Sequence, residues 1–167
     1  MTIRLPSPLR AAIAAACLAA SGAQAIEAGN ALPLASVPSA DSGAVTLVDG
    51  KARATYIDFW ASWCGPCRRS FPWMNHLQQK FGAQGLRIVA INVDSKRSDA
   101  NDFLAQVPAK FELAYDARGD VARRFGVETM PSSVLVGGDG KVIAVHQGFR
   151  DEDEAALEAR IAAALHQ

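Results

Sequence analysis

Two cysteines stand where an apolar stretch gives way to a segment typical of a helix, and this junction constrains the fold more than any other part of the chain. They are Cys64 and Cys67, separated by Gly65 and Pro66. Thiols at this spacing can close into a small disulfide and reopen by exchange, and the proline ring restricts the intervening loop. The sequence therefore predicts a redox centre held between a strand and a helix.

The residues around this junction alternate between strand and helix patterns. Residues 54–60 predict a strand, and the nearly continuous aliphatic run 86–93 predicts another that is buried on both faces. Pro66 can occupy the first turn of a helix that runs to Phe81, where Gly82 can end it. Further strands are expected at 45–48, 133–136 and 142–146, and further helices at 98–106, 116–125 and from 151 onwards. This order predicts an α/β fold in which helices cover a mixed sheet.

Residues 1–25 have the pattern of a secretory signal peptide. Arg4 and Arg10 give a positive start, residues 11–20 are apolar and rich in alanine, and residues 23–25 (Ala-Gln-Ala) form a small-x-small cleavage pattern. A retained transmembrane helix would need about 20 uninterrupted apolar residues, which this stretch lacks. We therefore expect export, cleavage near Ala25, and a periplasmic or otherwise extracytoplasmic product.

Cys17 provides the alternative at the N-terminus, because a cysteine that follows small residues in a bacterial signal can carry a lipid. Residues 14–16 are all alanine and lack the large aliphatic residue usually found three places before such a cysteine. A lipid anchor at Cys17 is therefore less favoured than cleavage. Either form of processing leaves the two cysteines of the junction together in the mature protein.

Beyond the leader, the composition indicates one soluble globular domain. Residues 26–43 are rich in Ala, Ser, Pro and Gly and predict a flexible lead, followed by a folded domain over residues 44–167. Lys and Arg balance Asp and Glu at 17 each, so no basic surface for nucleic acid is indicated. The histidines at 76, 146 and 166 lie far apart and do not form the pattern of a four-ligand zinc site. We expect neither a metal nor another cofactor.

The segment from Tyr56 to Cys67 resembles the active-site segment of thioredoxins. Pro72 stands where thioredoxins have a helix-kinking proline. Residues 125–127 (Phe-Gly-Val) followed by 130–132 (Met-Pro-Ser) are similar to their segment that ends in a cis-proline loop, and Gly148 stands where they have a glycine beside the site. The resemblance implies a thioredoxin fold, with a central mixed β-sheet flanked by helices on both faces.

One branch of that superfamily fits better than the others. The exported leader, Gly50-Lys51 before the active strand, and the longer segment between Asp94 and Leu113 are similar to the TlpA-like extracytoplasmic thiol-disulfide oxidoreductases of the ResA and CcmG type. The resemblance covers about residues 44–165 and depends on several separated motifs in the same order.

The resemblance implies a chemical role for three residues. Cys64, at the start of the expected helix, would be the attacking thiolate, because a helix N-terminus favours negative charge. Cys67 would be the resolving thiol. Asp58 matches an acidic residue of thioredoxins, and burial in an apolar strand would raise its pKa, which suits a base that takes a proton from Cys67. The alternative for Asp58 is an exposed position on the strand.

Four further residues are expected to contact substrates. Pro131 would follow a cis peptide bond, leaving the backbone of Met130 free to pair with an extended substrate segment. Trp63 would supply an aromatic edge, and Gly148 a surface with no side chain to obstruct an incoming chain. Met130 departs from the Ile or Thr often seen before this proline, so the range of partners stays open.

The implied function is the reduction of disulfides in exported proteins, with electrons from a membrane-embedded donor and a role in cytochrome c maturation. Gly65 and Pro66 between the cysteines resemble thioredoxin, at about −270 mV, more than the oxidant DsbA, at about −120 mV. A general disulfide oxidant or isomerase, a thiol peroxidase and a redox-inert binding module are the alternatives. A purely structural disulfide is disfavoured, because so small a loop removes little chain entropy. We expect a monomer.

Overall fold

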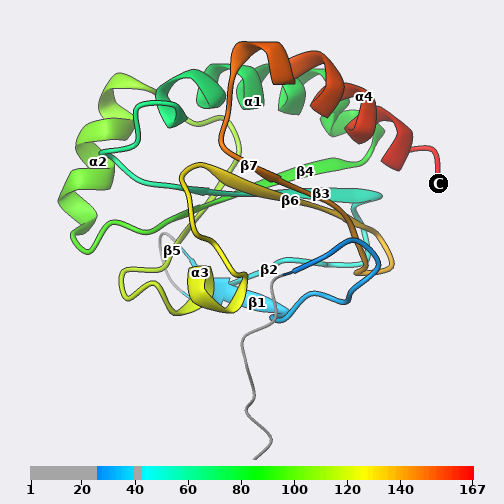
Figure 1. The fold of residues 1–167 in the computed structure, drawn as a ribbon, viewed down its shortest axis with the longest axis horizontal. Helices are drawn as coiled ribbons and strands as arrows, with labels where there is room; N and C mark the ends of the chain where they lie inside the picture. The colour runs from blue at the N-terminus through cyan, green and yellow to red at the C-terminus, as the bar shows by residue number, and fades with distance from the viewer. Residues whose placement is uncertain (1–25, 40–42) are drawn as a thin grey trace, which may run out of the picture.

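The computed structural model describes residues 26–39 and 43–167, so the predicted leader and Cys17 lie outside the described residues. A five-stranded sheet with the order β5-β4-β3-β6-β7 forms its centre (Figure 1). The strands are β3 (Ala54–Trp60), β4 (Leu86–Asn92), β5 (Glu112–Tyr115), β6 (Ser132–Gly137) and β7 (Val142–Gln147). The helices are α1 (Cys67–Phe81), α2 (Arg97–Gln106), α3 (Asp120–Arg124) and α4 (Glu154–Ala164), with 3-10 turns η1 (Gly82–Gln84) and η2 (Asp151–Asp153).

The central strand β3 organises the sheet. It pairs in parallel with β4 and antiparallel with β6, and all of its residues are buried. The expected strand at 54–60 and the helix reaching Phe81 are therefore confirmed. Pro66 is the residue directly before α1, where its missing N–H costs no helical hydrogen bond. The 3-10 turn η1 ends at Gly85, whose φ of 103° is a left-handed conformation that glycine adopts without strain.

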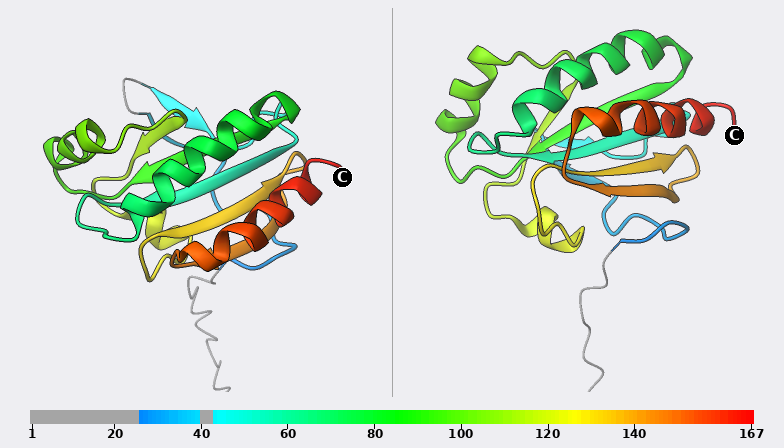
Figure 2. Two further views of the ribbon diagram at one scale, coloured as in Figure 1. Left: turned by 90° about the horizontal axis from the view of Figure 1, so that it is seen from above. Right: turned by 45° about the horizontal axis from the view of Figure 1, so that its top comes forward.

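Two apolar layers enclose the sheet. Helices α1, α2 and α4 cover one face. The other face is covered by α3 and by the antiparallel pair of short strands at residues 36–38 and 44–46 (Figure 1). Alternate residues of β3 divide between these layers, with Tyr56 and Trp60 facing α1 and α4, and Ile57 and Phe59 facing α3. Viewed from above the helices, α1 and α4 lie side by side across the sheet (Figure 2). The expected α/β architecture, with helices on both faces of a mixed sheet, is confirmed.

The structure differs from the expected flexible lead over residues 26–43. Within this stretch, β1 (Ser36–Pro38) pairs antiparallel with β2 (Ala44–Thr46), and Val37 is buried. Nearer the start, the Gly29 backbone N–H donates to the Val142 carbonyl at 2.8 Å. Apolar side chains spaced among the small residues pack on the α3 face, and they are Ile26, Leu32 and Leu34. The packed domain therefore begins before residue 44.

Two strands were not expected from the sequence, β1 and β5. Both are short, and β5 lies at the edge of the main sheet. Of its four residues only Ala114 is fully buried and Glu112 is exposed, so β5 lacks the continuous buried apolar run that marks β3 and β4. Across residues 26–39 and 43–167, no helix has the length and apolar character needed to cross a bilayer.

Candidate active site

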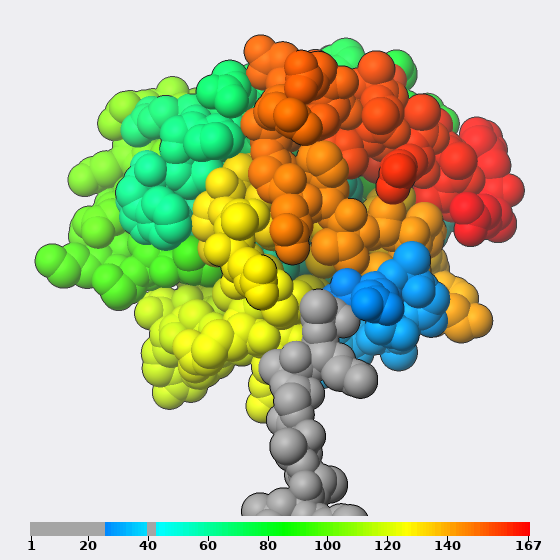
Figure 3. All heavy atoms as spheres, viewed as in Figure 1, coloured from blue at the N-terminus to red at the C-terminus, as the bar shows by residue number. Residues whose placement is uncertain are grey.

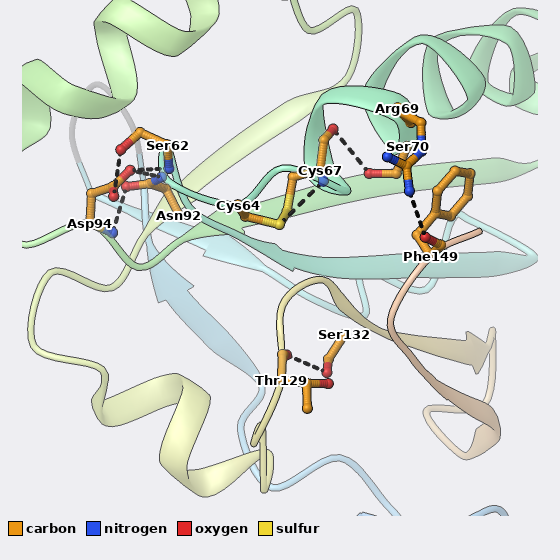
Figure 4. The surroundings of a disulfide bond; sticks show 10 residues. All are labelled: Ser62, Cys64, Cys67, Arg69, Ser70, Asn92, Asp94, Thr129, Ser132 and Phe149. Atoms are coloured by element: carbon orange, nitrogen blue, oxygen red, sulfur yellow. Dashed lines mark hydrogen bonds between the residues drawn. A yellow bond between two sulfur atoms is a disulfide. The ribbon is translucent and has the colours of Figure 1, made fainter. Parts of the chain in front are cut away.

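The two cysteines form a disulfide at the N-terminal end of α1. Cys67 is the first helical residue and is fully buried, whereas Cys64 precedes the helix and keeps 3% of its surface exposed. The Cys67 backbone N–H points at the Cys64 Sγ, with a nitrogen to sulfur distance of 3.2 Å (Figure 4). Free N–H groups and the helix dipole at this end stabilise negative charge. The geometry therefore favours a thiolate at Cys64 once the disulfide is reduced.

A buried carboxylate holds the loop that presents these cysteines. Asp94 accepts hydrogen bonds from the Ser62 backbone N–H at 2.8 Å and from the Ser62 hydroxyl at 2.9 Å (Figure 4). The Asn92 side-chain amide donates to the same carboxylate at 2.8 Å. Sequence reasoning missed this cluster, although two polar residues at the end of an aliphatic strand were a signal for it. Asp94 thus fixes the backbone immediately before Trp63 and Cys64.

Asp58 lies in the middle of β3 and is buried, with 2% of its surface exposed. It alternates with Tyr56 and Trp60, so its side chain is on the sheet face that α1 and α4 cover. Its Oδ2 has no hydrogen-bond partner, and burial raises the pKa of the carboxyl well above its ordinary value. The buried alternative of the two sequence interpretations therefore holds, and the exposed one is excluded.

The loop before β6 approaches the same end of the sheet. The peptide bond between Met130 and Pro131 is cis, as the resemblance implied. The Ser132 hydroxyl donates to the Thr129 carbonyl at 2.7 Å and closes the loop (Figure 4). The Pro131 carbonyl accepts the Gly148 backbone N–H at 2.8 Å, which ties the loop to the segment after β7.

The segment after β7 connects this loop to α1. Gly148 has a φ of 81°, which glycine adopts without strain, and the space where a Cβ would stand is empty. Its neighbour Phe149 packs on Trp73 of α1, and the Phe149 carbonyl accepts from the Arg69 guanidinium at 3.5 Å. The three separated segments expected at the site, around residues 64, 131 and 148, therefore meet at one end of the sheet.

Around the disulfide, the expected contact residues differ in exposure. Trp63 is 69% exposed, which is unusual for so large an apolar side chain. Met130 is partly buried against both apolar layers, and Pro131 is buried. An incoming chain would thus meet an aromatic side chain next to Cys64 and the backbone of the cis-proline loop.

The histidines do not gather at the site. His76 lies on α1, His146 on β7 and His166 beyond the end of α4. Within the described part of the chain, no three side chains of His, Cys, Asp or Glu come together in a way that could hold a metal ion. Exchange between thiols and disulfides needs only the sulfur atoms and a place for the proton.

Comparison with known proteins agrees with the fold and the dithiol. The model of the Redoxin family matches residues 27–161. The chain is 31% identical over 129 residues to the thiol-disulfide oxidoreductase ResA of Bacillus thuringiensis subsp. konkukian, covering 77% of this chain and 75% of that protein. It is 28% identical over 132 residues to ResA of Bacillus subtilis, covering 79% and 74% of the two chains.

Among solved structures, a protein of Chlorobium tepidum assigned as the thiol:disulfide interchange protein DsbE is 48% identical to this chain. The match has a TM-score of 0.80 and covers 84% of this chain and 99% of that one. The fold, the Cys64-Cys67 pair and the similar proteins all indicate thiol-disulfide chemistry. The chain therefore belongs to the Redoxin family and is a TlpA-like thiol-disulfide oxidoreductase of the thioredoxin superfamily.

Proposed function

We propose that the protein works outside the cytoplasm and reduces disulfides of exported proteins through a cycle between the Cys64-Cys67 dithiol and its disulfide. The observation that carries this proposal is the asymmetry of the pair. Cys64 stands at the N-terminus of α1 with a backbone N–H directed at its sulfur, while Cys67 is fully buried behind it. One thiol is thus arranged to attack and the other to resolve.

The cycle begins from the reduced protein. The Cys64 thiolate attacks one sulfur of a substrate disulfide, forms a mixed disulfide and releases the other substrate sulfur as a thiolate. Cys67 then loses its proton and attacks the Cys64 sulfur. The second substrate sulfur leaves, the Cys64-Cys67 disulfide closes, and two electrons have passed to the substrate. The structure corresponds to this oxidised state.

Asp58 is the base that we assign to the second step. It lies on the sheet face covered by the helix that begins with Cys67, and its raised pKa brings proton uptake toward neutral pH. A buried carboxylate oxygen that accepts no hydrogen bond makes the group a stronger base than a solvated carboxylate, because its charge is less stabilised, and the Asp58 Oδ2 is such an oxygen. Protonation of Asp58 would therefore accompany the attack by Cys67.

Substrate binding is assigned to the four residues around the disulfide. The Met130 backbone, next to the cis Pro131, would pair with an extended segment of the substrate. Trp63 would pack against substrate side chains, because most of its ring is exposed. Gly148 leaves room for the incoming chain, since the space beside it is open.

The cellular role is proposed from the leader and the relatives. The signal-peptide pattern in residues 1–25 supports an extracytoplasmic place for the folded domain, with cleavage near Ala25 favoured over a lipid at Cys17. The relatives named ResA and DsbE act, by their names, in thiol-disulfide chemistry. We extend this to a membrane-embedded electron donor, a monomeric reductase and a contribution to cytochrome c maturation.

The direction of electron flow is tested by a redox titration of the dithiol. Equilibration with glutathione or dithiothreitol buffers, followed by alkylation of free thiols, gives the potential. A value close to that of thioredoxin, about −270 mV, supports the reductant, whereas a value above about −150 mV would overturn it in favour of an oxidant or isomerase. Cys67→Ser should accumulate a mixed disulfide at Cys64 with its physiological substrates, and Cys64→Ser is the matched control that should not.

A further inference from the structure

Three polar side chains form a row across the sheet from its centre to its edge. Asp58 on β3 stands directly opposite Ser133 on β6, and Ser133 stands directly opposite His146 on β7. Directly opposite residues of antiparallel strands have side chains on the same face, with Cβ atoms roughly 5 Å apart. All three therefore face the layer that contains α1 and α4.

In the middle of this row, a hydrogen-bonded pair of hydroxyls borders a small cavity whose remaining lining is mostly apolar. The Tyr56 hydroxyl donates to the Ser133 Oγ at 2.8 Å. Beside this hydrogen bond lies a cavity of about 10 Å³, close to the size of one water molecule. It is lined from the sheet by Tyr56, Ser133, Leu135, Ala144 and His146, and from α4 by Leu157, Arg160 and Ile161.

At the outer end of the row, His146 reaches from the interior to the surface. Its Nε2 is buried and makes no hydrogen bond, yet 28% of its side-chain surface is exposed. The Asp153 carboxylate of η2 lies 3.4 Å from this nitrogen. The segment from β7 to α4 forms part of the molecular surface (Figure 3, orange to red). One imidazole thus borders both the internal cavity and solvent.

We propose that this row is the route by which the proton taken up by Asp58 leaves the protein, with His146 as its outermost group. The inference rests on the proposed role of Asp58 as base. Cys67 gives its proton to the Asp58 carboxylate, and the resulting carboxylic acid passes a proton through the Ser133 hydroxyl and a cavity water to the His146 Nε2. The imidazolium releases a proton to solvent, so Asp58 is again a carboxylate and His146 is again neutral.

Charged groups lie on both sides of His146. The Asp153 oxygen that is 3.4 Å from the His146 Nε2 also lies 3.6 Å from the Arg150 guanidinium. Arg160 lines the cavity from α4. Tyr56 is the titratable group that faces the row from β3, and burial and the nearby Asp58 charge raise its pKa, so it stays protonated.

Two-phase kinetics with an aromatic disulfide test this route. Reduced protein is mixed with excess 5,5′-dithiobis(2-nitrobenzoate) in dilute buffer at pH 7. The first equivalent of coloured thiolate reports attack by Cys64, and the second reports resolution by Cys67. We expect His146→Ala to leave the first phase unchanged and to slow the second about tenfold, less than the roughly 10²- to 10⁴-fold effect of a direct general base. Added imidazole should restore the second phase.

Three further variants make the test decisive. His146→Gln keeps a polar side chain, and should show the same slow second phase even if His146→Ala folds poorly. His76→Ala removes an exposed histidine of α1 and should behave as wild type. The route is overturned if both His146 variants resolve at the wild-type rate, or if imidazole leaves His146→Ala slow. Asp58→Asn tests the base itself, so an unchanged second phase in that variant counts against the proposed function of Asp58 and not against folding or the first phase.

Discussion

Replacing Asp58 with Asn should change how the stability of the oxidised protein depends on pH. Asp58 is buried, its Oδ2 accepts no hydrogen bond, and burial raises its pKa well above the ordinary value. In the unfolded chain the same carboxyl is solvated and ionises near its reference pKa of about 3.9. Folding must therefore either keep the carboxyl protonated or bury an unpaired charge, and both options cost free energy at neutral pH.

The sign and size of the effect follow from proton linkage. Below about pH 4 the carboxyl is protonated in both states, and it contributes no pH dependence. Above that value the unfolded state loses its proton while the folded state keeps it, so the free energy of unfolding falls by about 1.4 kcal/mol per pH unit. The fall continues up to the raised folded pKa. Each pH unit within this window therefore removes a noticeable share of a typical total of about 5–15 kcal/mol.

Urea unfolding of the oxidised proteins at intervals between pH 4.5 and 7.5 measures this directly. The difference in unfolding free energy between Asp58→Asn and wild type should grow with pH in favour of the variant. Asp102→Asn, at an exposed position of α2, removes an equal charge and controls for net charge. A constant difference between Asp58→Asn and wild type across the range, or one that shrinks with rising pH, would refute the raised pKa of the buried Asp58 carboxyl.

Two other substitutions separate the roles of neighbouring residues. Asp94→Ala removes the acceptor for the Ser62 N–H, the Ser62 hydroxyl and the Asn92 amide, so we expect a loss of about 2–3 kcal/mol in urea unfolding together with slower attack by Cys64; a loss of stability with an unchanged first kinetic phase would contradict a role in holding the active-site loop. Trp63→Ala removes an exposed ring, so stability should change by less than about 0.5 kcal/mol while KM for a protein disulfide rises more than kcat falls. Equal losses toward protein and small-molecule disulfides would contradict a role in substrate contact.

The parts of the fold that were predicted from the sequence are those with a strong local signal. The strand Ala54–Trp60 and the helix Cys67–Phe81 appear with the expected bounds, since a continuous apolar run and a proline at the helix start act within a few residues. The redox pair of cysteines and the cis peptide bond before Pro131 were likewise predicted from motifs that resemble those of thioredoxins. For Asp58 the sequence allowed both a buried and an exposed position on the strand, and the structure selects the buried one.

The parts that were missed depend on contacts between distant segments. Residues 26–39 have the composition of a linker, and only their packing on the α3 face and pairing with residues near 142 show otherwise. Strand β5 is too short and too exposed to have a period of its own. His146 was one of three scattered histidines in the sequence, and its alignment with Ser133 and Asp58 is a property of sheet register.

Two buried aspartates, one in the middle of β3 and one just after β4, illustrate how environment divides structural from chemical roles. Asp94 accepts three hydrogen bonds, which fix the backbone before Cys64. Asp58 lies one strand away, where its Oδ2 accepts none. Hydrogen-bond donors around Asp58 would stabilise the fold, but they would also stabilise the carboxylate and weaken it as a base. The instability caused by Asp58 and its ability to take a proton therefore have the same physical origin, and a substitution that removes one should remove the other.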